Sequence, residues 1–244
     1  MDNWTRPSTS LELENHQVDI WRISLDLYPA SAQWAESTLS ADESARAKCF
    51  YFEKDRRRYT LTHACLRDIL SHYLRCRHHE LTFSIDQYRK PFLSNCDLQF
   101  NLSHSGDYIL IAVAHKRKVG VDVEHFRINL ELEKIAKRFF SPMEHEEFST
   151  VPDEQKMTAF FNCWTRKEAY IKAHGLGMSM PLSSFDVSLT PNETTSLRAT
   201  RPDAAEASKW TLLSLDVQSG YAGALAVQGK DLEFRLWDWE RITQ

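Results

Sequence analysis

Two acidic residues stand where the sequence would let them act together. In the segment VGVDVE at residues 119–124, apolar and acidic residues alternate after the glycine. Successive side chains of a strand point to opposite faces, so the valines should enter a core while Asp122 and Glu124 stand together on the other face. Neighbouring carboxylates repel each other unless a cation lies between them, and Mg²⁺ prefers such oxygen ligands. The alternative is an edge strand with a solvated acidic face.

A third carboxylate lies in the segment WTRKEAYIK at residues 164–172. Trp164, Glu168 and Lys172 are four residues apart, so on a helix they form one stripe. This stripe offers a carboxylate and an ammonium group to a common site. The alternative is an ordinary surface ion pair between Glu168 and Lys172, with Trp164 serving only in packing.

An anion donor is suggested by FNLSHSG at residues 100–106. His104 stands between two serines, Ser103 and Ser105, in a predicted turn after a strand, where it could donate hydrogen bonds to an anion. The alternative is a turn histidine that lies on the surface without a role. The segment lacks the G-x-S-x-G pattern of a hydrolase nucleophile. Together, an anion donor, an acidic pair, a third carboxylate and a lysine suit phosphoryl transfer, in which positioning and charge neutralisation do most of the catalysis.

Helices and strands without a regular alternation must position these residues, which predicts an α+β fold. Alternation or short apolar runs predict strands at residues 18–27, 81–85, 100–102, 108–115, 119–124, 185–189, 210–215, 222–227 and 232–236. Helical spacing predicts helices at 31–39, 55–74, 130–140, 143–148 and 158–174, and Ser40 with Glu43 forms a capping-box pattern that opens another helix. Gly175 should end the helix that carries Glu168. Residues 1–17 are polar and predict a loose tail.

Composition limits the classes of function. The chain has 244 residues, 42% of them hydrophobic, and a formal net charge of −4, which does not favour a nucleic-acid binder. The five cysteines form no C-x-x-C pair and fit reduced thiols better than a disulfide framework. No signal peptide or membrane-spanning run is apparent, so we expect a cytoplasmic protein without a membrane partner.

The ordered motifs resemble those of the Sfp-type 4′-phosphopantetheinyl transferases. The residues that carry the resemblance are FNLSHSG at 100–106, VGVDVE at 119–124, KRFFSPME at 137–144 and WTRKEAYIKAHGLG at 164–177, with weaker matches at 45–52, 55–59 and 88–91. It implies a pseudo-dimer of two similar α+β halves, residues 1–117 and 118–244, with the active site in the cleft between them. It also implies the monomeric type of enzyme.

The resemblance further implies roles for individual residues. Asp122, Glu124 and Glu168 match metal ligands, Ser103 and His104 match contacts to coenzyme A phosphates, and Lys172 matches the group that neutralises the leaving diphosphate. Arg46 and Lys90 match basic positions around the adenosine 3′-phosphate, and Glu144 is a further motif carboxylate. Some members have a basic residue where this chain has Glu43, and Arg58 or Arg67 would have to compensate.

The implied reaction is transfer of 4′-phosphopantetheine from coenzyme A to a serine of an acyl or peptidyl carrier protein. It would need Mg²⁺ and release adenosine 3′,5′-bisphosphate, with Glu168, Lys172 and His104 as catalytic residues. The segment 175–182 offers Met178 and Met180 as apolar contacts for a carrier. Alternatives are a metal-dependent phosphoesterase, a coenzyme A-binding module without activity, and a structural zinc site among the histidines and cysteines of residues 63–79.

Overall fold

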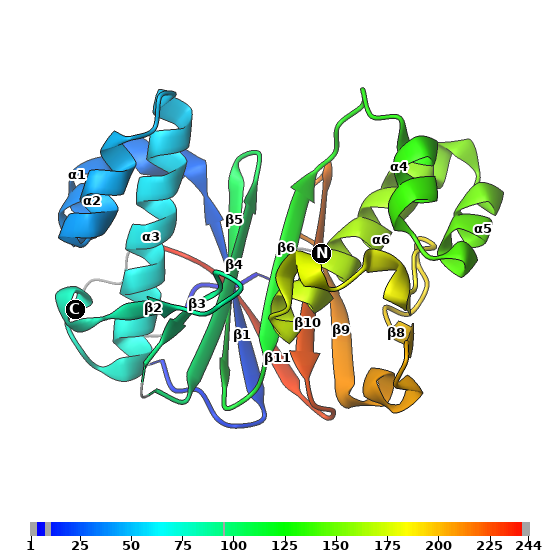
Figure 1. Ribbon diagram of the computed structural model, residues 1–244. Coiled ribbons are helices and arrows are strands. Elements are labelled where there is room, and N and C mark those ends of the chain that lie inside the picture. Colours follow the sequence, from blue (N-terminus) through cyan, green and yellow to red (C-terminus); the bar gives the residue numbers. More distant parts are fainter. Residues whose placement is uncertain (1–3, 8–10, 95, 241–244) are drawn as a thin grey trace.

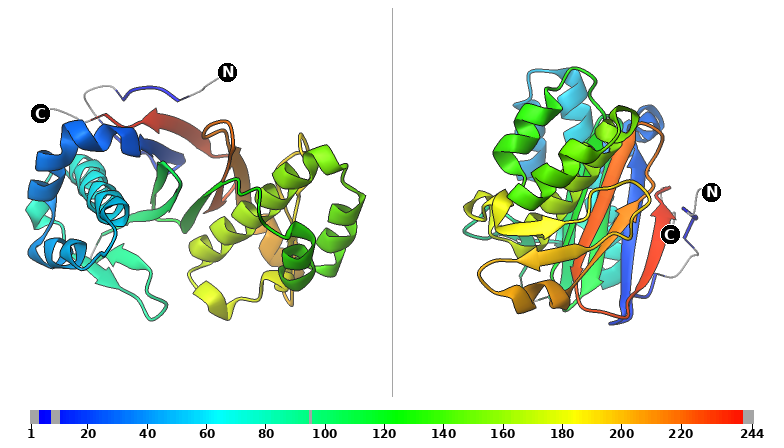
Figure 2. Two further views of the ribbon diagram at one scale, coloured as in Figure 1. Left: turned by 90° about the horizontal axis from the view of Figure 1, so that it is seen from above. Right: turned by 90° about the vertical axis from the view of Figure 1, so that its right-hand side faces the viewer.

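The computed structural model describes residues 4–7, 11–94 and 96–240 and has the α+β fold that the sequence predicts. Two groups of helices flank a central region of strands (Figure 1). The view from above in Figure 2 shows the two helix groups on opposite sides of the strands. Each group of helices therefore packs on one of two main sheets, as a pseudo-dimer requires.

Among its described residues, the first half contains three α-helices and five strands. The helices are α1 (Tyr28–Thr38), α2 (Ala41–Lys48) and α3 (Glu53–Leu74), and the strands are β1 (Gln17–Ser24), β2 (Phe83–Ile85), β3 (Pro91–Leu93), β4 (Leu98–Ser105) and β5 (Tyr108–His115).

The rest of the chain contributes three helices and six strands within the described residues. The helices are α4 (Leu132–Phe139), α5 (Pro142–Thr150) and α6 (Asp153–His174), and the strands are β6 (Val119–His125), β7 (Phe185–Val187), β8 (Leu197–Thr200), β9 (Trp210–Leu215), β10 (Tyr221–Gln228) and β11 (Glu233–Asp238). Short 3₁₀ helices occupy Leu25–Leu27, His78–Glu80, Gly177–Ser179, Leu182–Ser184 and Ala204–Lys209.

The two main sheets have the strand orders β11-β1-β5-β4 and β6-β10-β9, and β2-β3 and β7-β8 form two small ladders. The last strand, β11, crosses back to pair in parallel with β1, whereas the other neighbours in the main sheets are antiparallel. The end of the chain therefore completes the sheet of the first half (Figure 1).

Strand alternation divides the interior into three cores. On β5, Ile109, Ile111 and Val113 face α3 and its core, while Leu110, Ala112 and Ala114 face a central core between the two main sheets. Val119, Val121 and Val123 of β6 fill the same central core. A third core lies around α6 and the second sheet. The predicted inward direction of the β6 valines is confirmed.

Local signals placed most elements within a few residues. The capping box of Ser40 and Glu43 is present, and Gly175 ends α6 with a φ of 86°. Strands β3 and β8, with three and four residues, were not predicted. The prediction of a loose tail is wrong at Trp4, which is buried and donates a hydrogen bond to the Asp216 carbonyl. Residues 1–3 and 8–10 of that tail lie outside the described residues.

All five cysteines are free thiols. Among the described residues, no helix combines the length and apolar character that crossing a membrane would need.

Candidate functional site

The site lies where α6 crosses β6, and Gly120 permits this approach. A Cβ atom at Gly120 would lie 2.2 Å from the Ala169 carbonyl oxygen and 2.3 Å from the Ala173 nitrogen. Without that atom, the α6 backbone can pack directly on the strand. Glu168 and Lys172, which directly precede these two alanines on the helix, are thereby brought to the face of β6 that carries Asp122 and Glu124.

Asp122 is the centre of a buried polar cluster. It is 4% exposed, so the interpretation of a solvated acidic face is wrong for this residue. Its Oδ1 accepts hydrogen bonds from Ser103 Oγ at 2.8 Å and from Lys172 Nζ at 2.7 Å, and Lys172 Nζ also donates to Ser103 Oγ at 2.9 Å. Three motifs that are far apart in the sequence therefore meet in one hydrogen-bonded group.

Glu168 and Glu124 lie beside this cluster. Burial raises the pKa of Glu168, the negative charge of Asp122 and that of Glu124 raise it further, and Lys172 partly opposes them. Among the described side chains, no ion pair joins Glu168 to Lys172, because Lys172 is paired with Asp122. The interpretation of an ordinary Glu168–Lys172 surface pair is therefore wrong.

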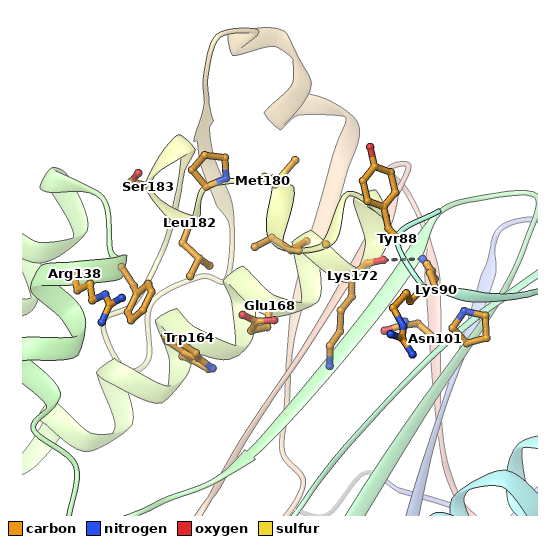
Figure 3. A pocket seen from close by; sticks show the side chains of 17 residues that line it. Tyr88, Lys90, Asn101, Arg138, Trp164, Glu168, Lys172, Met180, Leu182 and Ser183 are labelled. Carbon is orange, nitrogen blue, oxygen red and sulfur yellow. Dashed lines mark hydrogen bonds between the residues drawn. The ribbon is translucent and has the colours of Figure 1, made fainter. Parts of the chain in front are cut away.

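A cavity of about 730 Å³ opens beside Glu168 and Lys172. Figure 3 shows Trp164, Glu168 and Lys172 along one stripe of α6, with Tyr88 and Lys90 across from them. Much of its remaining wall is apolar and comes from the end of α4, from α6 and from the segment after α6: Phe139, Ile171, Met180, Pro181 and Leu182. Met180 is half-buried in this wall, and the Met178 side chain lies outside what the structure describes.

Ser103 and His104 differ from the sequence-based expectation. Both belong to β4, because the turn begins only at Gly106. Alternation along the strand therefore turns Ser103 toward β6, and His104 instead lines a pocket of about 130 Å³ against α3, with Phe50, Arg58, Tyr59 and His63 among its other residues. The pKa of His104 is lowered, chiefly because neighbouring atoms displace water from its ring. The positive charges of Arg58 and Lys172 lower this pKa further, although the side chain keeps an exposed surface.

The other predicted basic residues have different surroundings. Arg46 is exposed on α2, and Arg58 is half-buried and pairs with Asp55 at 2.5 Å. Lys90 donates to the carbonyls of Val119 and Lys172 at 3.1 and 2.7 Å, which ties the β2–β3 hairpin to the second half (Figure 3). Burial lowers the pKa of Lys90 to about 8, with Asp86 opposing and Lys118 adding to the shift. Their contacts to coenzyme A stay predictions.

Two further candidates prove to be structural. Arg67 is buried and binds Glu43 at 2.6 Å and the His78 and Leu81 carbonyls, so it cannot replace the missing basic residue. Glu144 is fully buried, caps α5, accepts from the Val187 amide and pairs with Lys167 at 2.7 Å.

No metal-binding group is preassembled in the part of the chain that the structure describes. No three histidine, cysteine, aspartate or glutamate side chains there are gathered closely enough to hold an ion, either at the acidic pair or among the histidines and cysteines of residues 63–79. Asp122 Oδ2 is nevertheless buried without a hydrogen-bond partner in the described structure. An unpartnered buried carboxylate oxygen is costly, and a cation would satisfy it.

Sequence reasoning assigned no role to Gly120 or Ser105, which both contact the site. Ser105 donates a hydrogen bond to Glu124 Oε2 at 2.8 Å. The alternation of β4 contained the signal for Ser105, because Ser103 and Ser105 are two residues apart, as Asp122 and Glu124 are on β6. Nothing in the sequence pattern indicated that these strands lie side by side.

Similar proteins cover nearly the whole chain. Residues 118–226 match the 4′-phosphopantetheinyl transferase superfamily, and residues 27–116 match the 4′-phosphopantetheinyl transferase N-terminal family. The 4′-phosphopantetheinyl transferase HetI of Nostoc sp. is 39% identical, over 97% of this chain and 98% of its own length. The 4′-phosphopantetheinyl transferase Sfp of Bacillus subtilis is 30% identical, over 80% of this chain and 84% of its own. The crystal structure of Thermotoga maritima holo-[acyl-carrier-protein] synthase is 25% identical, covers 46% of this chain and 63% of its own, and has a TM-score of 0.35.

Proposed function

The chain belongs to the 4′-phosphopantetheinyl transferase superfamily, and we propose that it transfers 4′-phosphopantetheine from coenzyme A to a serine of an acyl or peptidyl carrier protein. The observation that carries the residue assignments is the meeting of Ser103, Asp122 and Lys172 in one hydrogen-bonded group, with Glu168 beside it. We also propose a cytoplasmic, monomeric enzyme with halves at residues 1–117 and 118–244.

The carboxylates fit a divalent cation. Asp122 has a buried oxygen without a partner in the described structure, and the pKa of Glu168 is raised by burial and by two carboxylate neighbours, a repulsion that a cation relieves. Asp122, Glu124 and Glu168 would hold Mg²⁺. When bound, the ion would withdraw negative charge from the diphosphate of coenzyme A.

The residues of the chain would then share the steps of the transfer. Glu168 takes the proton of the carrier serine, whose oxygen forms a bond to the β-phosphorus. The bond from that phosphorus to the bridging oxygen breaks, and adenosine 3′,5′-bisphosphate leaves with the electron pair. Lys172 and His104 donate hydrogen bonds to the phosphate oxygens. Arg46, Arg58, Lys90 and Ser103 hold the remaining phosphates.

The cavity beside Glu168 supports an approach of the carrier from this side. Its wall is largely apolar, and Arg138, Lys90 and Lys172 line it as well, so it would suit an acidic partner with apolar contacts. The carrier serine would enter next to the base. A water-using phosphoesterase is disfavoured, since the similar proteins are named as transferases.

Replacement of Glu168 tests the assignment. Glu168→Gln should lower kcat by at least about 100-fold, the usual contribution of a general base, while coenzyme A binding measured by calorimetry stays within a few-fold. Glu154→Gln, at an exposed position in the first turn of α6, is the matched control. Activity is read as the gain of one phosphopantetheine in the intact mass of an apo carrier protein. Wild-type kcat in Glu168→Gln would refute the base, and wild-type protein that leaves the carrier unmodified would refute the function.

A further inference from the structure

Strands β4 and β6 belong to different sheets, yet side chains of β4 bind β6 at regular intervals. Asn101 Oδ1 accepts from the Val121 amide at 2.9 Å, Ser103 Oγ donates to Asp122 Oδ1 at 2.8 Å, and Ser105 Oγ donates to Glu124 Oε2 at 2.8 Å. These contacts advance by two residues along β4. The first half of the chain thus supplies one hydroxyl for each carboxylate of the acidic pair.

The Ser105 hydroxyl is held in the orientation that donates to Glu124. Its oxygen accepts a hydrogen bond from the His125 amide at 3.1 Å, so its single proton is left for the carboxylate. The turn that follows is fixed as well. The Asp107 amide donates to Tyr221 Oη at 3.0 Å, and a Cβ at Gly106 would lie only 2.3 Å from that oxygen. Ser105 is therefore a buried and doubly constrained donor.

Glu124 also has a second partner, which faces the solvent. Arg127 Nη2 lies 3.2 Å from the same oxygen, and the Arg127 side chain is 60% exposed. Exposed ion pairs contribute little and are mobile. Without the Ser105 hydroxyl, the Glu124 carboxylate would be free to follow Arg127 away from Asp122. With it, both polar contacts of Glu124 within the described residues fall on Oε2, and Oε1 stays available.

We propose that Ser105 is a positioning residue, which aims the Glu124 carboxylate at the cation site shared with Asp122 and Glu168. The inference rests on the proposed function, because it assumes that these carboxylates bind a divalent ion. Groups that orient metal ligands commonly change metal affinity by 10- to 100-fold, although they do not touch the metal. Ser105 would act in this way from the opposite half of the molecule.

Metal affinity of the full chain tests the proposal without an activity assay. Mn²⁺ alone is titrated into wild-type protein and into Ser105→Ala, Ser105→Thr and Glu124→Gln, with electron paramagnetic resonance reporting free Mn²⁺. Ser105→Ala should weaken Mn²⁺ binding about tenfold, and Ser105→Thr, which keeps the hydroxyl, should bind within about threefold of wild type. In transfer assays Ser105→Ala should need more Mg²⁺ for half-maximal rate and should keep the wild-type KM for carrier. Ser84→Ala, a half-buried strand serine bound to Ser94, is the matched control.

The outcomes separate this inference from the function on which it rests. Wild-type Mn²⁺ affinity in Ser105→Ala, together with weakened binding in Glu124→Gln, would overturn the role of Ser105 and leave the metal site intact. Unchanged Mn²⁺ affinity in Glu124→Gln and in Asp122→Asn would overturn both the role of Ser105 and the proposed metal site. If Ser105→Ala does not fold, Ser105→Cys replaces it, because the thiol is nearly the same size and is a weak donor; wild-type affinity in that variant would count equally against the proposal.

Discussion

The negative charge of Glu43 is balanced by hydrogen bonds from neighbouring side chains of α3. Its carboxylate accepts from Arg67 at 2.6 Å and lies 3.2 Å from His63. Burial alone would raise its pKa, but the hydrogen bonds from His63, Arg67 and the Ser40 amide outweigh burial and lower the pKa from 4.5 to about 2. Glu43 is therefore committed to joining α2 to α3, and a grip on the 3′-phosphate would have to come from Arg46 and Arg58.

This lowered pKa gives a stability prediction with a defined sign. A carboxyl group whose pKa falls on folding stabilises the protein above its unfolded pKa, here about 4.5, and loses that contribution as the pH falls toward 2. Glu43→Gln keeps the capping box but removes the charge. We expect it to lower the free energy of unfolding by about 3 kcal/mol at pH 7, since one pKa unit corresponds to about 1.4 kcal/mol. Urea unfolding between pH 7 and pH 3 measures the difference.

The difference between wild type and Glu43→Gln should narrow once the pH drops below about 4.5. Glu53→Gln is the control, because the Glu53 carboxylate forms only exposed pairs with Arg56 and Arg57. A difference that stays constant over the whole pH range would show that the charge of Glu43 is not what joins the two helices.

At the scale of elements, periodicity predicted which residues share a face but not which elements meet. The alternation of β6 predicted that Asp122 and Glu124 stand together, and the spacing of α6 predicted the stripe of Glu168 and Lys172. The structure adds the crossing of α6 over β6, the pairing of Lys172 with Asp122, and the neighbourhood of β4 and β6. These are long-range contacts, and single-sequence periodicity carries no information about them. Only the resemblance to a family indicated that the motifs share one site.

Gly120 decides the distance between the two elements that carry the site. The Cβ of Gly120→Ala would collide with backbone atoms of Ala169 and Ala173, which cannot rotate away as a side chain could. Overpacking of this kind costs about 1–3 kcal/mol. We expect Gly120→Ala to lose transfer activity by at least about 100-fold even where it is fully folded, because a shift of about 1 Å in Glu168 and Lys172 is enough for such a loss.

The comparison for Gly120→Ala is a variant that is destabilised elsewhere. Ile69→Val removes one methylene from the core between α3 and the first sheet and should cost about 0.5–1.5 kcal/mol without affecting kcat. Melting temperature and single-turnover rate are measured for both variants. Equal rates in folded Gly120→Ala and wild type would mean that α6 can be displaced without harm to the chemistry.

At the scale of the whole molecule, the chain closes on itself through β11. Arg235 on this strand donates two hydrogen bonds to buried Asp19 on β1, at 2.6 and 2.7 Å, and Tyr73 on α3 donates to the same carboxylate. Nearby, Arg22 on β1 pairs with Asp238 at 2.7 Å, and Trp239 donates to Asp68 on α3 at 2.9 Å. The strand that follows the second sheet is thus held in the first half by polar contacts as well as by strand pairing.

These contacts should make the two halves unfold as one unit. In a double-mutant cycle, Arg235→Ala should cost about 3–5 kcal/mol, since the buried Asp19 carboxylate loses two hydrogen bonds and keeps the one from Tyr73. Asp19→Ala should cost less, since the Arg235 side chain is 23% exposed and water can solvate it. The double variant should cost less than the sum of the two single variants, with a coupling of about 0.5–3 kcal/mol.

Urea unfolding is followed by far-ultraviolet circular dichroism, which reports both halves. It is also followed by tryptophan fluorescence, in which Trp21, Trp34, Trp237 and Trp239 report the first half and Trp164 and Trp210 report the second. A single coincident transition is expected in wild type, and its separation into two steps in the variants would show that the contact between Asp19 and Arg235 couples the halves. If the wild type instead unfolds in two separate steps, the halves unfold independently and β11 does not unite them.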